Sequence, residues 1–371
     1  MKRNLFALML ALALCLGLLT ACGGGPAGEE TPPAEGSAPV EESNAPGSPA
    51  PESDTQTIVD MGGTEVTLPR EIHTIVDTWS AATDDLFNLG AAELLVSAHS
   101  AAVSDVSVLV YPAMAELEDY SQATAEELLV LDPDLVICSN NDKAEELRNA
   151  GLNAVNLSYM TYDDFKKSTL LLGQILGGEY EARAQELGEY VDWVSETLST
   201  DLADVADEDK PTVYYLMTSD PSNLYATCGA GSIMDEWITL AGGKLATEAL
   251  GNGMGLRDVT AEQILATNPD VIMIDGDNTE EVRDALLSSQ EWSGVTAVQN
   301  NAIYSIPKGC FWWGRLCGDT PLQALWAASV LYPDLVSYDI HEETKEYYAQ
   351  FKQCELTDEQ VDDILRVDLL P

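Results

Sequence analysis

The chain has 371 residues and a formal net charge of −46, because 63 Asp and Glu residues face only 17 Lys and Arg residues. This excess of negative charge argues against nucleic acid as a partner and against electrostatic binding to anionic lipid. The three histidines, His73, His99 and His341, are scattered along the chain, so a site for a bare transition-metal ion built from converging histidines is not expected.

The first 22 residues have the pattern of an export signal. A positively charged start precedes an apolar run over residues 5–19, which is short for a membrane span. The run ends in a Thr-Ala pair before Cys22 and three glycines, which resembles a bacterial lipobox; the alternative is ordinary signal cleavage beside an incidental cysteine. We expect Cys22 to be acylated, which would anchor the protein to the outer face of the cytoplasmic membrane.

Residues 23–56 are Gly, Pro, Ser, Glu and Ala with hardly a large apolar side chain, so a disordered tether is expected there. About 315 residues follow, more than one hydrophobic core usually serves. We therefore expect an N-terminal lobe over residues 57–176, a connecting helix over 177–205 and a C-terminal lobe over 206–371.

The first half of this region predicts short strands at residues 74–76 and 95–97. Residues 124–137 (TAEELLVLDPDLVI) then indicate a helix that begins with capping-box spacing between Thr124 and Glu127. The helix must end before Pro133, and the apolar run after it fits a buried parallel strand. This segment therefore predicts a helix, a turn and a strand in succession.

The connecting helix is predicted from apolar residues at helical spacing between residues 179 and 200. Gly177 and Gly178 break the helix that precedes it. A single connecting helix would restrict hinge motion more than two or three crossing strands would. The apolar positions are Leu187, Tyr190, Val191, Val194 and Leu198.

The second half repeats the pattern of the first. Residues 260–273 (TAEQILATNPDVIM) match residues 124–137 at six of fourteen positions, with six further conservative exchanges. Further strands are predicted at residues 213–216 and 303–306. The fold class is therefore α/β: two Rossmann-like lobes with mostly parallel sheets, joined by one long backbone helix.

Several short motifs accompany the two repeats in a fixed order. In order and spacing they resemble the helical-backbone class (class III) of periplasmic substrate-binding proteins of ABC importers, whose members bind iron–siderophore complexes, haem, cobalamin and occasionally oxyanions. The resemblance covers nearly everything from residue 57 to 370. The motifs are DMGGTEVTLP (60–69), LFNLG (86–90), LAGG (240–243), LWAA (325–328) and LYP (331–333).

The resemblance implies an extracytoplasmic, lipid-anchored receptor that captures a ferric siderophore-type complex and delivers it to a membrane permease. Cobalamin, haem or a molybdate-type oxyanion are the alternative ligands. The resemblance also implies that Glu126 and Glu262, at matching positions of the two repeats, dock into permease arginines; alternatively, each only complements its helix dipole. A monomer is expected, with no cofactor, catalytic residue or resident metal beyond any iron or cobalt that the ligand carries.

Open α/β sheets bind ligands at the carboxyl ends of their strands. The loop over residues 307–315 is the most informative, since two adjacent tryptophans and an arginine suit a planar or chelated anionic ligand. One of these two tryptophans is expected in the core, but the sequence does not say which. The predicted ligand-binding residues are Trp79, Ser80, Asn140, Tyr159, Tyr225, Trp312, Trp313 and Arg315.

Two rival classes of protein lack support in the sequence. An enzyme would need motifs that are missing, such as GxSxG, HExxH or a phosphate loop, and the glycines of residues 251–255 follow no predicted strand. A purely structural surface lipoprotein would not need the paired glutamates. Five cysteines follow Cys22, and whether the nearest pair, Cys310 and Cys317, forms a disulfide is left open by the sequence.

Overall fold

The computed structural model describes residues 54–256 and 258–367, which belong to one compact unit over residues 53–371. The export signal, Cys22 and almost all of the predicted tether lie outside the described residues. None of the helices in the described part has the length and apolar character needed to cross a membrane.

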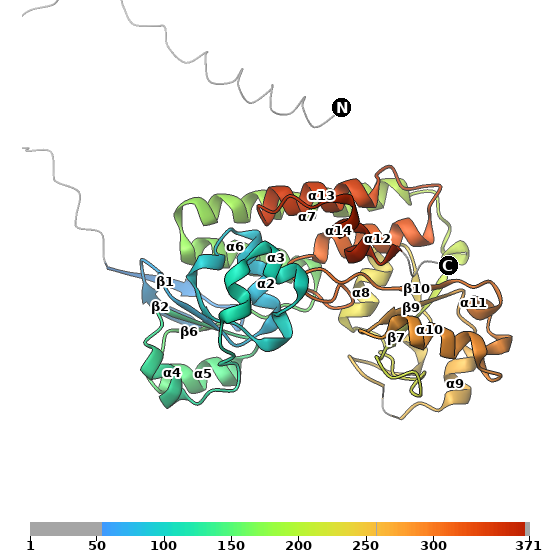
Figure 1. Ribbon diagram of the computed structural model, residues 1–371, viewed down its shortest axis with the longest axis horizontal. Helices are drawn as coiled ribbons and strands as arrows, with labels where there is room; N and C mark the ends of the chain where they lie inside the picture. Colours follow the sequence, from blue (N-terminus) through green and yellow to red (C-terminus); the bar gives the residue numbers. More distant parts are fainter. Residues whose placement is uncertain (1–53, 257, 368–371) are drawn as a thin grey trace, which may run out of the picture. The chain divides into compact units, whose positions relative to one another are not determined.

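Two four-stranded parallel sheets form the centres of two lobes (Figure 1). The first has the order β4-β3-β5-β6 and the second the order β8-β7-β9-β10, so each strand of one sheet has a counterpart in the other. The strands of the first sheet are β3 (Ile75–Asp77), β4 (Leu95–Ser97), β5 (Leu135–Cys138) and β6 (Ala154–Asn156). Those of the second are β7 (Thr212–Met217), β8 (Lys244–Leu245), β9 (Val271–Asp275) and β10 (Ile303–Ser305).

An antiparallel hairpin of β1 (Thr55–Val59) and β2 (Glu65–Pro69) precedes the first sheet. Strand β1 begins two residues before the lobe boundary expected at residue 57, because Thr55 pairs with Pro69 and Gln56 with Leu68. The Gln56 amide also donates to the carbonyl of Ile175 at 2.7 Å. These bonds tie the start of the lobe to the helix that ends it.

Helices cover the sheets and link the lobes (Figure 1). Those of the first half are α2 (Ser80–Asn88), α3 (Asp105–Val110), α4 (Ala125–Leu131), α5 (Asn141–Asn149), α6 (Tyr162–Leu176) and α7 (Gly178–Asp201). Those of the second half are α8 (Ile233–Leu240), α9 (Ala261–Ala266), α10 (Thr279–Ser288), α11 (Thr296–Gln299), α12 (Thr320–Leu331), α13 (Ile340–Phe351) and α14 (Asp358–Leu365).

Both repeat copies form the predicted helix, turn and strand, and both capping boxes are present. The structure adds a reason for the shared Pro-Asp pair. Asp134 accepts the backbone N–H of Thr74 at 2.9 Å, and Asp270 accepts that of Thr212 at 2.8 Å. In each lobe this carboxylate therefore fixes the start of the neighbouring strand to the strand of the repeat.

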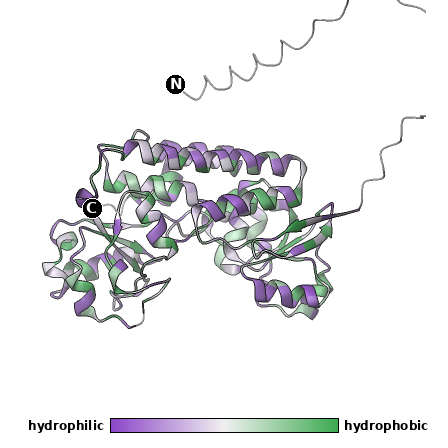
Figure 2. Ribbon diagram, turned by 180° about the vertical axis from the view of Figure 1, so that it is seen from behind, coloured by the Kyte–Doolittle hydropathy of each residue, from purple (hydrophilic) through white to green (hydrophobic). Residues whose placement is uncertain are grey.

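The long helix α7 agrees with the predicted connecting helix to within a few residues. It begins after Gly177, whose φ of 69° suits glycine, and buries Leu187, Val191, Val194 and Leu198 on one face. It packs against α6 and α2 of the first lobe and against α8 and α12 of the second. Purple and green alternate along α7, as in an amphipathic helix, whereas the strands are mostly green (Figure 2).

Candidate functional site

The carboxyl ends of β9 and β10 bring charged and aromatic side chains together. Lys308, just after β10, donates to Asp277, just after β9, with 2.7 Å between Nζ and Oδ1. The same ammonium lies 4.2 Å from the centroid of the half-buried Trp312 ring. The Arg315 Cζ lies 5.3 Å from that ring, so two cations contact one indole.

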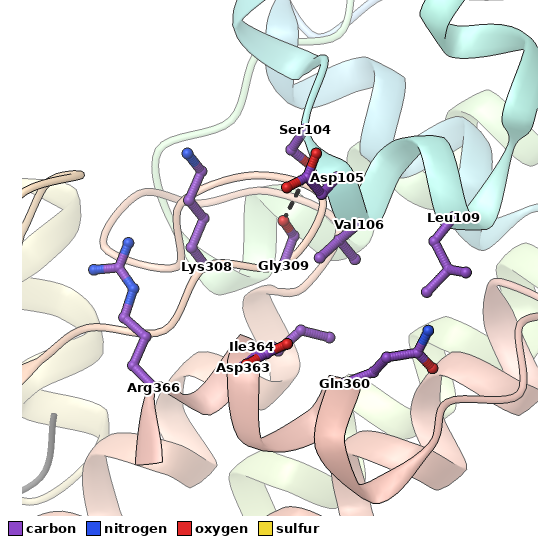
Figure 3. Close-up of a pocket in the computed structure, with 10 residues that line it drawn as sticks. All are labelled: Ser104, Asp105, Val106, Leu109, Lys308, Gly309, Gln360, Asp363, Ile364 and Arg366. Carbon is purple, nitrogen blue, oxygen red and sulfur yellow. Dashed lines mark hydrogen bonds between the residues drawn. The ribbon is translucent and has the colours of Figure 1, made fainter. Parts of the chain in front are cut away.

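A hollow of ≈ 690 Å³ adjoins this cluster (Figure 3). The first lobe supplies the start of α3, and the second lobe supplies Lys308 and helix α14. Figure 3 shows the cationic side chains on one side and apolar side chains of α3 on the other. The lining residues are Ser104, Asp105, Val106, Leu109, Lys308, Gly309, Gln360, Asp363, Ile364 and Arg366.

Two contacts hold the edges of this hollow. The Ser104 hydroxyl of the first lobe donates to the carbonyl of Cys310 at 3.2 Å and to that of Gly309 at 3.4 Å. Arg366, after α14, donates to the carbonyl of Gly276 at 2.9 Å. The hollow is therefore lined from both lobes and joined to the strand ends through Lys308 and Arg366.

Of the eight predicted ligand residues, the structure brings Trp312 and Arg315 together at this edge, although neither lines the hollow itself. Trp313 is fully buried, and its indole N–H donates to Asp319 at 2.9 Å. One of the adjacent tryptophans is thus in the core, as expected. The burial of Trp313 argues against its predicted contact with ligand.

The predicted residues of the first lobe lie at the ends of β3, β5 and β6. Tyr159 is buried, and its hydroxyl donates to Asp85 at 3.1 Å. Its ring packs against the half-buried Trp79 with 4.8 Å between ring centroids, so packing accounts for this side chain. Ser80 is the first, half-buried residue of α2. Asn140 is exposed and caps α5 by accepting the N–H of Lys143 at 2.9 Å.

Tyr225 also has a packing role in the structure. Its ring stacks on the buried Trp292 with 5.7 Å between centroids, and its hydroxyl donates to Glu291 at 2.7 Å. These contacts lie within the second lobe and argue against a ligand contact.

Glu126 and Glu262 are both exposed, each in the first turn of its helix. Helices α4 and α9 lie at the same end of the two lobes, below the sheets in the view of Figure 1. Hydrogen bonding at the helix start lowers the pKa of Glu262 below its usual value. Both side chains are therefore exposed at the same end of the two lobes.

Sequence reasoning missed Arg366 and Asp277. Arg366 is about fifty residues from the loop that carries the adjacent tryptophans (residues 307–315), and no local sequence pattern links the two. The signal available was the scarcity of cations, since only 17 Lys and Arg occur in the chain.

A buried charge cluster was also missed. Lys352 forms ion pairs with Asp84 of α2 and with Asp319, and all three side chains are at most 2% exposed. Burial raises the pKa of Asp319 to about 6. Burial opposes the charge of Lys352, but the two carboxylates raise its pKa well above the usual value.

The part of the chain that the structure describes contains neither a disulfide nor a cluster of metal-ligating side chains. All five cysteines there are free, so Cys310 and Cys317 are not bonded to each other. Within the same residues, no group of three His, Cys, Asp or Glu side chains is placed to hold a metal ion.

Comparison with known proteins agrees with this two-lobed arrangement. The family model described as "Periplasmic binding protein" matches residues 75–309. The molybdate-binding protein MolA of Haemophilus influenzae is 24% identical over 263 residues, which cover 64% of this chain and 72% of the relative. A periplasmic solute binding protein from Veillonella parvula superimposes with a TM-score of 0.74 and 24% identity, covering 85% of this chain and 98% of that one. An ABC transporter solute binding protein from Sulfurospirillum deleyianum gives a TM-score of 0.72 and 22% identity, covering 84% and 99%.

The chain therefore belongs to the periplasmic binding proteins, in their helical-backbone class. It is an extracytoplasmic substrate-binding protein of the ABC transporter type and not an enzyme. Proteins of this class work with an ABC permease and a small-molecule ligand.

Proposed function

We propose that this chain is the lipid-anchored receptor of an ABC importer that captures a ferric siderophore-type iron complex and delivers it to the permease. The observation that carries the proposal is the Trp312 ring in contact with Lys308 and Arg315, beside a hollow lined from both lobes. Cys22 would carry the lipid, and the receptor would act as a monomer.

The chemistry of the cluster suits an anionic chelate. An indole face offers a planar apolar surface, and a guanidinium offers directional hydrogen bonds to oxygen anions. The hollow of ≈ 690 Å³ lies in the size range of sites for drug-sized ligands, about 300–1,000 Å³. A ligand that combines aromatic or apolar rings with anionic oxygens would use both features.

An oxyanion is the second candidate. The relative from Haemophilus influenzae is named for molybdate binding, and three cations, Lys308, Arg315 and Arg366, lie near the strand ends. The hollow is larger than a four-oxygen anion requires, which favours the chelate. Haem and cobalamin would also use an aromatic wall.

Delivery would depend on the two rim glutamates. Glu126 and Glu262 would bind arginines of the permease through charge-assisted hydrogen bonds, which are strong and directional. Their fixed separation on one rim would report whether the lobes are correctly set. Ligand binding would shift the balance between lobe arrangements, and transport would follow without chemistry on the ligand.

Tryptophan fluorescence of the signal-free protein tests the ligand. We expect a ferric siderophore to quench the fluorescence with a Kd below about 1 μM, and Trp312→Phe or Arg315→Ala to weaken the binding at least about tenfold. Trp193→Phe, a half-buried tryptophan on α7, is the matched control and should leave the Kd unchanged. Binding of molybdate, haem or cobalamin in place of every ferric siderophore would overturn the iron assignment.

A further inference from the structure

Asp275 is the last residue of β9, and its side chain is buried beneath the cluster formed by Lys308, Trp312 and Arg315. Its side chain is 1% exposed, and its Oδ2 accepts the hydroxyl of Tyr215, which is fully buried on the neighbouring strand β7. The same Oδ2 lies 3.6 Å from Nε of Arg315. One buried carboxylate oxygen therefore joins a core tyrosine to the arginine of the site.

The chain is built closely around this carboxylate. A Cβ placed on Gly314 would lie 2.6 Å from the Asp275 Cγ and 2.8 Å from the Tyr215 hydroxyl oxygen, so only glycine fits there. The carbonyl of Gly314 accepts the indole N–H of Trp237, also fully buried, at 3.3 Å. The backbone that carries Arg315 is thus fixed against the second-lobe core.

The Arg315 guanidinium is held on one side. Asp275 is on the Nε side, and the Trp312 ring lies 5.3 Å from Cζ. The side chain keeps 41% exposure. In the part of the chain that the structure describes, Arg315 forms an ion pair with Asp275 through Nε. The two terminal nitrogens of the guanidinium are therefore left to bind a ligand.

We propose that Asp275, held by Tyr215, positions Arg315 so that the terminal nitrogens of its guanidinium bind two neighbouring anionic oxygens of the ligand. This inference rests on the proposed function, and it specifies the ligand chemistry further. The ligand presents a carboxylate, a pair of chelating oxygen anions or an oxyanion edge, because parallel N–H donors of a guanidinium match such a pair.

A charge-neutralising role for Asp275 makes the opposite prediction. If the carboxylate only offset the charge of Arg315, Asp275→Asn would make the site more positive and strengthen the binding of anions. If it positions the guanidinium, the same change weakens binding, because Asn lacks the charge that holds Nε. Arg366 and Asp277 also act on Asp275 electrostatically, and neither is altered by this change.

The binding test is a double-mutant cycle with molybdate and a ferric catecholate chelate as probes. For whichever probe the wild type binds, we expect Asp275→Asn and Arg315→Ala each to raise the Kd by about tenfold or more. The double variant should be no weaker than Arg315→Ala alone, since the aspartate acts through the arginine. Tighter binding by Asp275→Asn, or additive losses in the double variant, would overturn the proposal.

A second readout needs no ligand. Arginine Nε–H signals in proton–nitrogen NMR spectra report a held guanidinium, and Arg315→Lys assigns the signal. We expect that signal to be slowly exchanging in the wild type and averaged in Asp275→Asn, with Tyr215→Phe between them. An unchanged signal in Asp275→Asn would refute the positioning. Failure of the wild type to bind either probe while the signal behaves as expected would refute the proposed ligand instead.

Discussion

The Lys352 ammonium lies 3.2 Å from the Asp319 carboxylate, and neither side chain has any exposed surface. Asp84, 235 residues before Asp319 in the chain, binds the same ammonium and accepts the N–H of Asp319 at 3.2 Å. Nearby, Asn88 of α2 donates to the carbonyl of Gly318 at 2.7 Å. These contacts join α2 of the first lobe to residues 318–319, which follow the loop over residues 307–315, and to the end of α13.

Replacing Lys352 with Met should destabilise the protein by about 3–5 kcal/mol, because two buried carboxylates lose their cation. Urea denaturation measures the loss. Lys345→Met is the matched control: its pair with Asp358 lies at the surface, where water screens the two charges, so the loss should be much smaller. Equal urea midpoints for the two variants would show that the buried cluster contributes no more to stability than the exposed pair.

Asp77, fully buried at the end of β3, predicts a pH dependence of stability. Burial raises the pKa of Asp77 to about 7, above its ordinary value near 3.8. The folded state then binds the proton more tightly than the unfolded state, so the stabilisation is present below about pH 4 and is lost as the pH rises through about 7.

Asp77→Asn removes this titration and keeps an acceptor for the N–H of Trp79. Between pH 5 and pH 8 the free energy of unfolding of the wild type should fall by on the order of 1–3 kcal/mol more than that of the variant. Thermal unfolding at both pH values measures the difference. Parallel pH profiles for the two proteins would exclude Asp77 as the titrating group.

The adjacent tryptophans should separate stability from binding. Trp313→Phe removes the indole N–H that donates to Asp319, and a lost bond to a charged group costs about 1.5–3 kcal/mol. Trp312→Phe changes a half-buried ring whose hydrogen-bonding partner, Asp277, is exposed to solvent, so its cost should stay below about 1 kcal/mol. Chemical denaturation measures the free energy of unfolding of both variants. A larger loss of stability in Trp312→Phe than in Trp313→Phe would contradict this prediction.

Changing both Glu126 and Glu262 to Ala should abolish most uptake while leaving the ligand Kd in solution unchanged. The reason is that both carboxylates are exposed on helices away from the strand-end cluster. Ligand uptake into cells and fluorescence titration give the two readouts.

Glu359→Ala is the matched control for docking. Glu359 is exposed at the same position of another helix that begins with a capping box, α14, so it shares the helix-start environment but does not lie on α4 or α9. Its variant should transport normally. A sharp drop in ligand affinity in the glutamate double variant, or equal uptake in all variants, would contradict the docking role.

The repeat, the capping boxes and the long amphipathic helix were predictable from sequence because each is a local pattern. Thr124 and Thr260 cap their helices through residues three positions away, and the apolar runs after Pro133 and Pro269 need no distant partner to be identified. The two-lobed α/β class follows from these signals. The loop that carries Trp312 and Arg315 was also predictable, because two adjacent tryptophans and an arginine stand out within a short stretch of sequence.

Only the tertiary structure decided which of these side chains lie at the strand ends and which lie in the core. Trp312 and Trp313 are neighbours in sequence, yet the second enters the core because Asp319 accepts its N–H there. The partners of Arg315 and Lys352 lie tens to hundreds of residues away, and a lone Asp84 or Asp275 carries no local mark of burial. Such pairs arise from packing between distant segments, where desolvation makes each buried charge require a partner.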